Sequence, residues 1–218
     1  MRRIVMLLLM IVGLGVPLLL TSPISMAVPP VEEPSAAGST RALMDGSPTM
    51  NDLSRTDLLQ VSAGGSHTCV INRAGQVTCW GALSVPEDLG TVYQVSAGYY
   101  HTCAVTAEGV LHCYGKATVP PSDLGAVSQV SSGWYYTCAL TVEGVLRCWG
   151  QNGWGQATVP GELGTVRQVS TGESHTCALT VEGALRCWGQ NEAGQATVPN
   201  DLGTVSQVSA GGNHTCAV

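Results

Sequence analysis

Phenylalanine is absent from this chain of 218 residues, and Lys116 is its single lysine. Charged residues make up only 11% of the sequence, and the formal net charge is −6 at pH 7. This scarcity of basic residues argues against binding to nucleic acid or to an anionic membrane surface, because both need clustered Lys and Arg. A core without phenylalanine must be built from Val, Leu and Ala together with the recurrent Trp.

Signatures of catalysis are missing as well. The sequence shows no paired carboxylates, no nucleophile elbow, no glycine loop that would cradle a phosphate and no calcium loop. Residues 57–218 show no helical period of apolar side chains. These features predict a chain that is not an enzyme and that holds no cofactor and no metal ion.

Residues 1–27 have the pattern of a secretory signal peptide. Arg2 and Arg3 precede an apolar run from Ile4 to Leu20, and Ser25-Met26-Ala27 is a small-residue cleavage site. The alternative is an uncleaved membrane anchor, since about 17 apolar residues approach the lower limit for a span. Cleavage after Ala27 would leave seven basic and fifteen acidic residues, a net charge of −8. The predicted location is therefore secreted or cell-surface, with no membrane contact after cleavage.

Residues 28–56 are rich in Pro, Ser, Ala and acidic residues and show no apolar alternation. Such a composition predicts a flexible spacer. The repeat domain is predicted to span residues 57–218. Nine cysteines in an exported chain favour disulfides over a reduced metal site.

The repeat is clearest in HTCALTVEGALRCWG, which runs from His175 to Gly189. Near-copies begin at His67, His101 and Tyr136, and a fifth begins at His214 and is cut off by the end of the chain. The first cysteines of the five copies are spaced by 34, 35, 39 and 39 residues. Self-similarity at this period predicts a repeat architecture.

Each complete copy has the pattern of a β-hairpin. In the fourth copy, Val181-Glu182-Gly183 can form a three-residue loop with the glycine in the left-handed conformation. Counting outward then pairs Cys177 with Cys187, at a separation within disulfide range. The second cysteine follows the first by ten in every complete copy. The predicted disulfides are therefore Cys69–Cys79, Cys103–Cys113, Cys138–Cys148 and Cys177–Cys187, and Cys216 is predicted to be unpaired.

Strand alternation predicts two different faces for this hairpin. Cys177, Leu179, Leu185 and Cys187 fall on one face, and Ala178, Arg186 and Trp188 fall on the other. A QVSAG-like strand precedes each hairpin, and a Val-Pro pair ends each of the first four units. The predicted unit is a small antiparallel sheet of about four short strands, which is a propeller blade. The fold class is all-β, a partial β-propeller of about four blades plus an incomplete fifth.

The residues from Gly172 to Gln195, with their G-x-x-H-T-C-A-L-T, C-W-G and G-Q elements, resemble the regulator-of-chromosome-condensation repeat family. The segment from Gly133 to Gln156 shows the same pattern with Tyr in place of His. The GQATVP runs at Gly155 and Gly194 are also similar to repeats of the secreted, bacterial, propeller-type beta-lactamase inhibitory proteins. The resemblance implies a fragment of a seven-bladed ring, and self-association if the ring stays open. It further implies binding of a protein through loops on one propeller face.

The recurrent histidines lie two residues before each first cysteine, which raises the possibility of catalysis or metal binding. Because they share one repeat position, which Tyr136 fills in the third copy, the prediction is structural: capping of a turn or a bond to a neighbouring backbone. The aromatic residue after each second cysteine is predicted to pack, and His112 to lie on a surface strand. The residues concerned are His67, His101, His175 and His214, and Trp80, Tyr114, Trp149 and Trp188.

Five further aromatic residues lie in one inter-strand loop of two adjacent copies, where the other copies have small or polar residues. Variable positions on a repeated scaffold are where binding specificity is placed. The alternative is that these residues only cover the top of a core. The predicted binding patch is Tyr99, Tyr100, Trp134, Tyr135 and Tyr136.

Three functions are compatible with these features. The first is a secreted, disulfide-stapled module that binds an extracellular protein or another ligand through loops on one propeller face. The second is a secreted enzyme inhibitor of the beta-lactamase-inhibitor type, and the third is an extracellular enzyme on a propeller scaffold. The repeated positions account for nearly all titratable side chains, which favours binding over catalysis.

Overall fold

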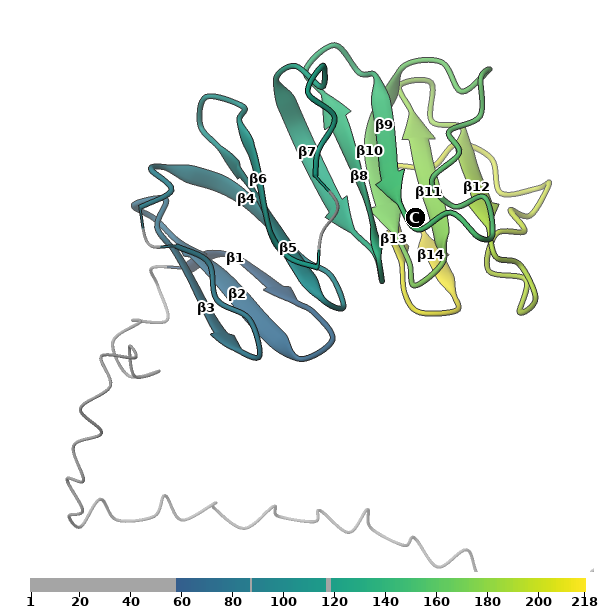
Figure 1. Ribbon diagram of the computed structural model, residues 1–218. Helices are drawn as coiled ribbons and strands as arrows, with labels where there is room; N and C mark the ends of the chain where they lie inside the picture. Colours follow the sequence, from purple (N-terminus) through teal and green to yellow (C-terminus); the bar gives the residue numbers. More distant parts are fainter. Residues whose placement is uncertain (1–57, 87, 117–118) are drawn as a thin grey trace, which may run out of the picture. The chain divides into compact units, whose positions relative to one another are not determined.

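A computed structural model describes residues 58–86, 88–116 and 119–218. The helices and strands of the fold in these residues are all β-strands (Figure 1). The predicted signal peptide (1–27) and spacer (28–56), and the first residue of the predicted repeat domain, lie outside the described residues. The strands are β1 (Leu58–Ala63), β2 (His67–Asn72), β3 (Val77–Gly81), β4 (Val92–Ala97), β5 (His101–Thr106), β6 (Leu111–Gly115), β7 (Val127–Ser132), β8 (Tyr136–Thr141), β9 (Leu146–Gly150), β10 (Val166–Thr171), β11 (His175–Thr180), β12 (Leu185–Gly189), β13 (Val208–Ala210) and β14 (Thr215–Ala217).

The strands form four three-stranded antiparallel sheets and a two-stranded fifth, each from consecutive strands. The first strand of each sheet contacts the first strand of the next, as β1 with β4 and β4 with β7, so these strands lie innermost. The sheets lie side by side in chain order without closing a ring (Figure 1). The predicted all-β partial propeller is confirmed, with β13–β14 as the incomplete fifth blade.

The prediction of about four strands in each sheet was wrong, because the Val-Pro segments form no strand. Proline has no N–H to donate to a ladder. The neighbouring amides are used in turns instead: the Thr158 N–H donates to Gly155 O at 3.0 Å, and the Thr197 N–H donates to Gly194 O at 3.0 Å. These segments therefore run as loops from one sheet to the next.

The hairpin register is the predicted one. Cys177 faces Cys187 and Leu179 faces Leu185, and the Thr180 N–H closes the loop on Ala184 O at 3.0 Å. Gly183 has φ of 85°, the left-handed conformation that favours glycine. The other three hairpins repeat this pairing of cysteines.

Disulfides join the second and third strands of the four complete sheets. The first cysteine of each pair is fully buried, whereas Cys216 on β14 is a free, exposed thiol. Bridges of this kind favour an oxidising, extracytoplasmic environment. The four disulfides are Cys69–Cys79, Cys103–Cys113, Cys138–Cys148 and Cys177–Cys187.

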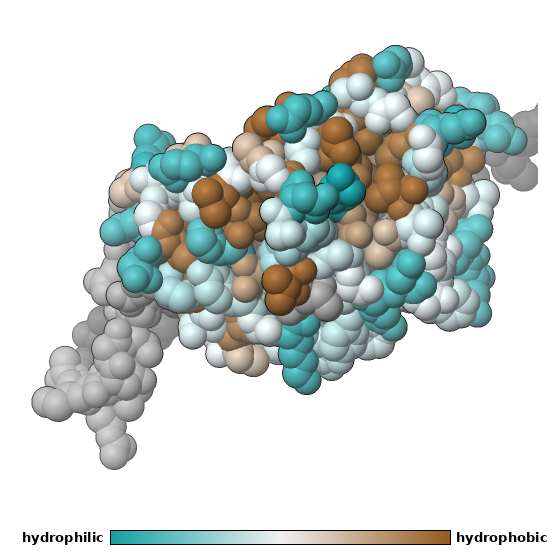
Figure 2. Space-filling view, turned by 45° about the horizontal axis from the view of Figure 1, so that its top comes forward, coloured by the Kyte–Doolittle hydropathy of each residue, from teal (hydrophilic) through white to brown (hydrophobic). Residues whose placement is uncertain are grey.

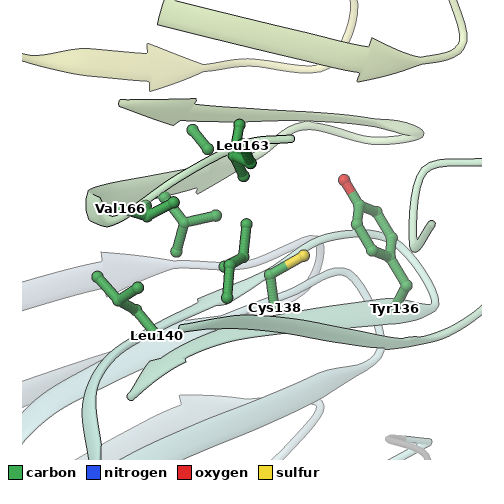
Figure 3. Close-up of a cluster of buried hydrophobic side chains, with 8 residues drawn as sticks. Tyr136, Cys138, Leu140, Leu163 and Val166 are labelled. Atoms are coloured by element: carbon green, nitrogen blue, oxygen red, sulfur yellow. The ribbon is translucent and has the colours of Figure 1, made fainter. Parts of the chain in front are cut away.

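The core lies between neighbouring sheets. Figure 3 shows Tyr136, Cys138 and Leu140 extending from β8 towards Leu163 and Val166. The cysteine-and-leucine face of one sheet therefore packs on the first strand of the next, and Ala178 on the second strand completes the layer. Similar clusters recur between the other sheets, as the predicted strand faces require.

Polar side chains of the QVS motif join the innermost strands to one another. The Val95 N–H on β4 donates to Gln60 Oε1 on β1 at 2.8 Å, and the Ala97 N–H donates to Ser62 Oγ at 2.9 Å. The same bonds recur from β4 to β7 and from β10 to β13. Each blade is thus fixed to the next by buried apolar contact and by repeated hydrogen bonds.

Candidate functional site

The loops between the first and second strands begin with a glycine that closes a tight turn. The Gly98 N–H donates to His101 O at 2.8 Å, and the corresponding bond recurs in all five sheets. A Cβ atom at Gly98 would lie only 2.6 Å from Gly133 O in the adjacent loop, so a larger residue does not fit there. The loop backbones are therefore packed closely, and the two residues after each glycine vary from copy to copy.

Four of the five predicted patch residues form a continuous set of ring contacts, which we call the aromatic patch: Tyr99, Tyr100, Trp134 and Tyr135. The ring centroids of Tyr99 and Tyr100 are 4.5 Å apart, those of Tyr99 and Trp134 are 5.5 Å apart, and those of Trp134 and Tyr135 are 5.8 Å apart. The rings of Tyr100 and Tyr135 stack at 4.7 Å. Two neighbouring loops thus present one aromatic surface.

The aromatic patch is partly open to solvent, and the Lys116 side chain lies against it. Tyr99 is 45% exposed, and the Nζ of Lys116 lies 5.1 Å from the centroid of the Tyr100 ring. A hydrogen bond with the Tyr100 side chain raises the pKa of Tyr135. The indole Nε1 of Trp134 is buried and has no hydrogen-bond partner among the described residues. The Trp134 ring is therefore positioned by its contacts with the neighbouring rings.

Tyr136 was wrongly included in the predicted patch. It is 1% exposed, and its hydroxyl donates to His175 O in the next sheet. Burial raises the pKa of Tyr136. The physical reason is its position: Tyr136 is the first residue of β8 and points into the core between the sheets (Figure 3). His67, His101 and His175 are buried at the same repeat position. Tyr136 therefore belongs to the scaffold.

Three of the repeated histidines connect neighbouring sheets. They were predicted to cap a turn or to bond to a neighbouring backbone, but their partners are threonine side chains. In His67, His101 and His175 the Nε2 atom lies within hydrogen-bond distance of the hydroxyl of the threonine that precedes the first cysteine of the next copy. Burial lowers the pKa of all three, and that of His101 to about 4 with a smaller contribution from the charge of His67. The pairs are His67–Thr102 at 2.6 Å, His101–Thr137 at 2.9 Å and His175–Thr215 at 2.9 Å.

The aromatic residue after each second cysteine lies on the sheet face opposite to the cysteines. Trp149 and Trp188 pack against the core clusters of the preceding sheets, and Trp188 Nε1 donates to Gln156 O at 3.0 Å. Trp80 is 39% exposed, since no described sheet precedes β1–β3. His112 lies half-buried on β6, opposite Ala104.

Exposed apolar residues elsewhere lie on several elements, and the exposed residues of β1 include Leu58, Leu59 and Val61. Figure 2 shows hydrophobic residues on one face in separate groups, divided by hydrophilic ones. At the hairpin end of the sheets the exposed residues are single valines of the turns, with no ring contacts. They are Val110, Val142, Val145 and Val181.

A shallow hollow of about 330 Å³ lies where the glycine-rich loops of all five sheets meet. It takes in the first variable position of every loop: Gly65, Tyr99, Trp134, Glu173 and Gly212. Among the residues lining this hollow, Glu173 alone is charged. Glu173 was not among the predicted site residues, although its position in the repeat, aligned with Tyr99 and Trp134, was the signal that could have identified it.

Two other hollows lie away from the aromatic patch. One of about 330 Å³ lies beside β14, where the complete sheets have their third strand, and the other, of about 560 Å³, lies along the innermost strands. Within the described residues no group of three or more His, Cys, Asp or Glu is arranged to hold a metal ion. None of the described segments is a helix long and apolar enough to cross a membrane.

Solved structures with a similar fold come from several organisms. The chain is similar to Prp20p from Saccharomyces cerevisiae, with a TM-score of 0.64 and 18% identity over 74% of this chain and 55% of Prp20p. It is also similar to human WBSCR16 (TM-score 0.63, 21% identity, 74% and 57% covered). A third is the CRINKLY WD40 ectodomain of the Arabidopsis thaliana receptor kinase ACR4 (TM-score 0.61, 23% identity, 76% and 61% covered).

The chain spans less than two thirds of each of these structures. Because the sequence identities are only 18–23%, the similarity to these structures shows the fold alone. No curated protein matches the sequence.

A sequence model of the regulator of chromosome condensation (RCC1) repeat matches residues 59–82, 92–118, 127–156 and 166–195, which together make up about half of the chain. The matched segments coincide with the four complete sheets and with the loops that follow them. The chain belongs to the family of regulator of chromosome condensation repeat proteins.

Proposed function

We propose that this chain is a secreted or cell-surface module that binds another protein through the inter-strand loops on one face of the propeller. The observation that carries the proposal is the aromatic patch, in which Tyr99, Tyr100, Trp134 and Tyr135 contact one another in series. Large aromatic residues dominate the binding energy of protein interfaces. The corresponding loops of the other copies have small or polar residues, so the patch is not needed to build a blade.

The scaffold beneath the loops supports this role. Disulfides fix the hairpins, and hydrogen bonds join each innermost strand to the next. A partner that docks on loops held this rigidly pays little entropy for ordering them. His67, His101 and His175 are engaged with threonine hydroxyls of neighbouring sheets, which favours binding over catalysis.

Proteins that share the fold also bind proteins. Structures of yeast Prp20p concern its binding to Gsp1p and histones and its complex with Kap60. These likenesses support a protein partner for the present chain without identifying it. A secreted inhibitor is the special case in which the partner is an enzyme and the loops cover its active site.

The test is capture of the partner by the purified, exported protein from the extracellular fraction of its source, with identification by mass spectrometry. The patch variant carries Tyr99→Ser, Tyr100→Ser, Trp134→Ser and Tyr135→Ser. We expect its affinity for the captured protein to fall by about 100-fold or more, since each aromatic anchor typically contributes more than about 1 kcal/mol. Circular dichroism should show an unchanged β-sheet spectrum.

The matched control carries Val110→Ser, Val142→Ser and Val181→Ser, which remove exposed apolar side chains from the hairpin end. It should bind as the unmodified chain does. Equal binding by the patch variant and the unmodified chain would contradict the proposal. Loss of folding in the patch variant would show instead that these residues only cover the core, and a captured second copy of the chain would indicate self-association.

A further inference from the structure

The hollow at the meeting point of the loops has an acidic side and an aromatic side. The Trp134 N–H donates to Glu173 O at 3.3 Å, and the Glu173 N–H donates to Gly212 O at 3.4 Å. These bonds hold the Glu173 loop directly between the Trp134 loop and the last glycine-rich loop. Tyr99, in ring contact with Trp134, extends the aromatic side.

Glu173 is half-buried and forms no ion pair among the described residues. Its Oε2 atom is 3.6 Å from the position that a Cβ atom at Gly212 would take, so the carboxylate lies beside a residue without a side chain. No basic residue is among those that line the hollow. A carboxylate that is partly removed from water favours a cationic group that can donate hydrogen bonds to it.

The two rings favour the same kind of group. A Lys or Arg side chain placed over the face of Trp or Tyr is attracted by the ring quadrupole, most strongly by Trp. The aromatic patch already contains such a pair at its outer side, where Lys116 Nζ lies 5.1 Å from the Tyr100 ring centroid. At the inner side, Tyr99 and Trp134 line the hollow together with Glu173, and none of the described residues that line it is basic.

We propose that this hollow binds a basic side chain, lysine or arginine, presented by the protein partner. The Glu173 carboxylate pairs with the ammonium or guanidinium group, and the rings of Tyr99 and Trp134 contact the cation and its aliphatic stem. This inference rests on the proposed function and names the chemistry of the group at the centre of the interface. The net charge of −6 favours a basic partner surface as well.

The probe is a set of three blocked tripeptides, acetyl-Gly-Lys-Gly-amide, its arginine analogue and its norleucine analogue, which keeps the stem without the charge. Binding is followed by the NMR signal of the Trp134 indole N–H, assigned by its loss in Trp134→Phe. We expect saturable shifts with the lysine or arginine peptide. The norleucine peptide should bind about tenfold more weakly or not at all, because it lacks the charge-assisted hydrogen bonds.

Glu173→Gln keeps the shape of the side chain and removes its charge, and should weaken binding of the basic peptides by about tenfold. The matched control, Glu143→Gln, removes the same charge from an exposed hairpin turn and should have no effect. Equal shifts with lysine and norleucine, no shift with either basic peptide, or unchanged binding in Glu173→Gln would each overturn the inference. Which of the two basic peptides binds more tightly identifies the side chain.

The same variant separates this inference from the proposed function. If Glu173→Gln captures the partner as well as the unmodified chain does, while the serine variant of the aromatic patch does not, the binding surface stands and the basic anchor is wrong. If the peptides bind as expected but the patch variant still captures the partner, the hollow is a cation site outside the interface.

Discussion

The two ends of the blades are built from the same repeat but differ in how much they vary. At the hairpin end, the Gly75, Gly109, Gly144 and Gly183 turns have nearly the same φ, between 76° and 85°, and each turn closes with the same backbone hydrogen bonds. At the loop end, the first variable position is glycine, tyrosine, tryptophan, glutamate and glycine in turn. The hairpin end therefore maintains the fold, and the loop end is where one copy can differ from another at little structural cost.

The largest expected effect on stability is a response to pH that originates at the loop end. Burial lowers the pKa of His101 to about 4, below the ordinary value of 6.5 for an unfolded histidine. The unfolded chain therefore binds a proton first, and stability is complete above pH 6.5 and is lost as pH falls towards 4. The loss from His101 is up to about 3 kcal/mol. Urea denaturation at a series of pH values measures it.

His101→Gln should lower the stability at neutral pH but remove part of this slope between pH 6.5 and 4. At the hairpin end, hydrogen bonds from Thr106 and Thr180 lower the pKa of Glu108 and Glu182, so their contribution is lost only at more acidic pH. An unchanged slope in His101→Gln would mean that the pH response does not originate at this histidine.

A smaller effect on stability is expected from removal of a disulfide, which lies between the loop end and the hairpin end of a blade. Cys138→Ser with Cys148→Ser opens the disulfide of the third hairpin and should lower the free energy of unfolding by about 2–3 kcal/mol. Partner affinity at temperatures well below unfolding should change by less than about threefold, because hydrogen bonds still hold the loops. A large loss of affinity in the folded double variant would show that the loop end depends directly on the hairpin beneath it.

The smallest effect concerns backbone conformation at the hairpin end. Gly183→Ala places a side chain at φ of 85° and should cost about 1–2 kcal/mol, measured by thermal unfolding. Gly161→Ala is the matched control, because Gly161 does not have positive φ and a Cβ atom there meets nothing within 4 Å. Similar destabilisation in both variants would argue against a conformational role for Gly183.

Local pattern was sufficient to predict the hairpins. The cysteine spacing, the turn glycines and the alternation of Leu and Ala all require the same register, which the structure contains from Cys69 onwards. The number of strands in a blade could not be counted in this way. Val-Pro segments fit an edge strand or a loop equally well, and turn hydrogen bonds at Thr158 and Thr197 decide for the loop.

The candidate site was only partly predictable, because local pattern does not show which residues of neighbouring sheets meet. Unusual aromatic residues in two copies identified Tyr99, Tyr100, Trp134 and Tyr135, but the direction of a side chain at the start of a strand depends on the neighbouring sheet. Tyr136 is therefore buried although it adjoins Tyr135 in sequence. Glu173 gave little signal on its own, because a single polar loop residue is ordinary until its neighbours across the fold are known.

The amino-acid sequence by itself determined the strands, their pairing within each blade and the disulfides, since these involve residues close together in the chain and follow from spacing and turn chemistry. Only the tertiary structure decided which loops meet. Residues about 35 to 40 positions apart are brought side by side when the cysteine-and-leucine face of one blade packs on the next. That packing places Tyr99, Trp134 and Glu173 around one hollow.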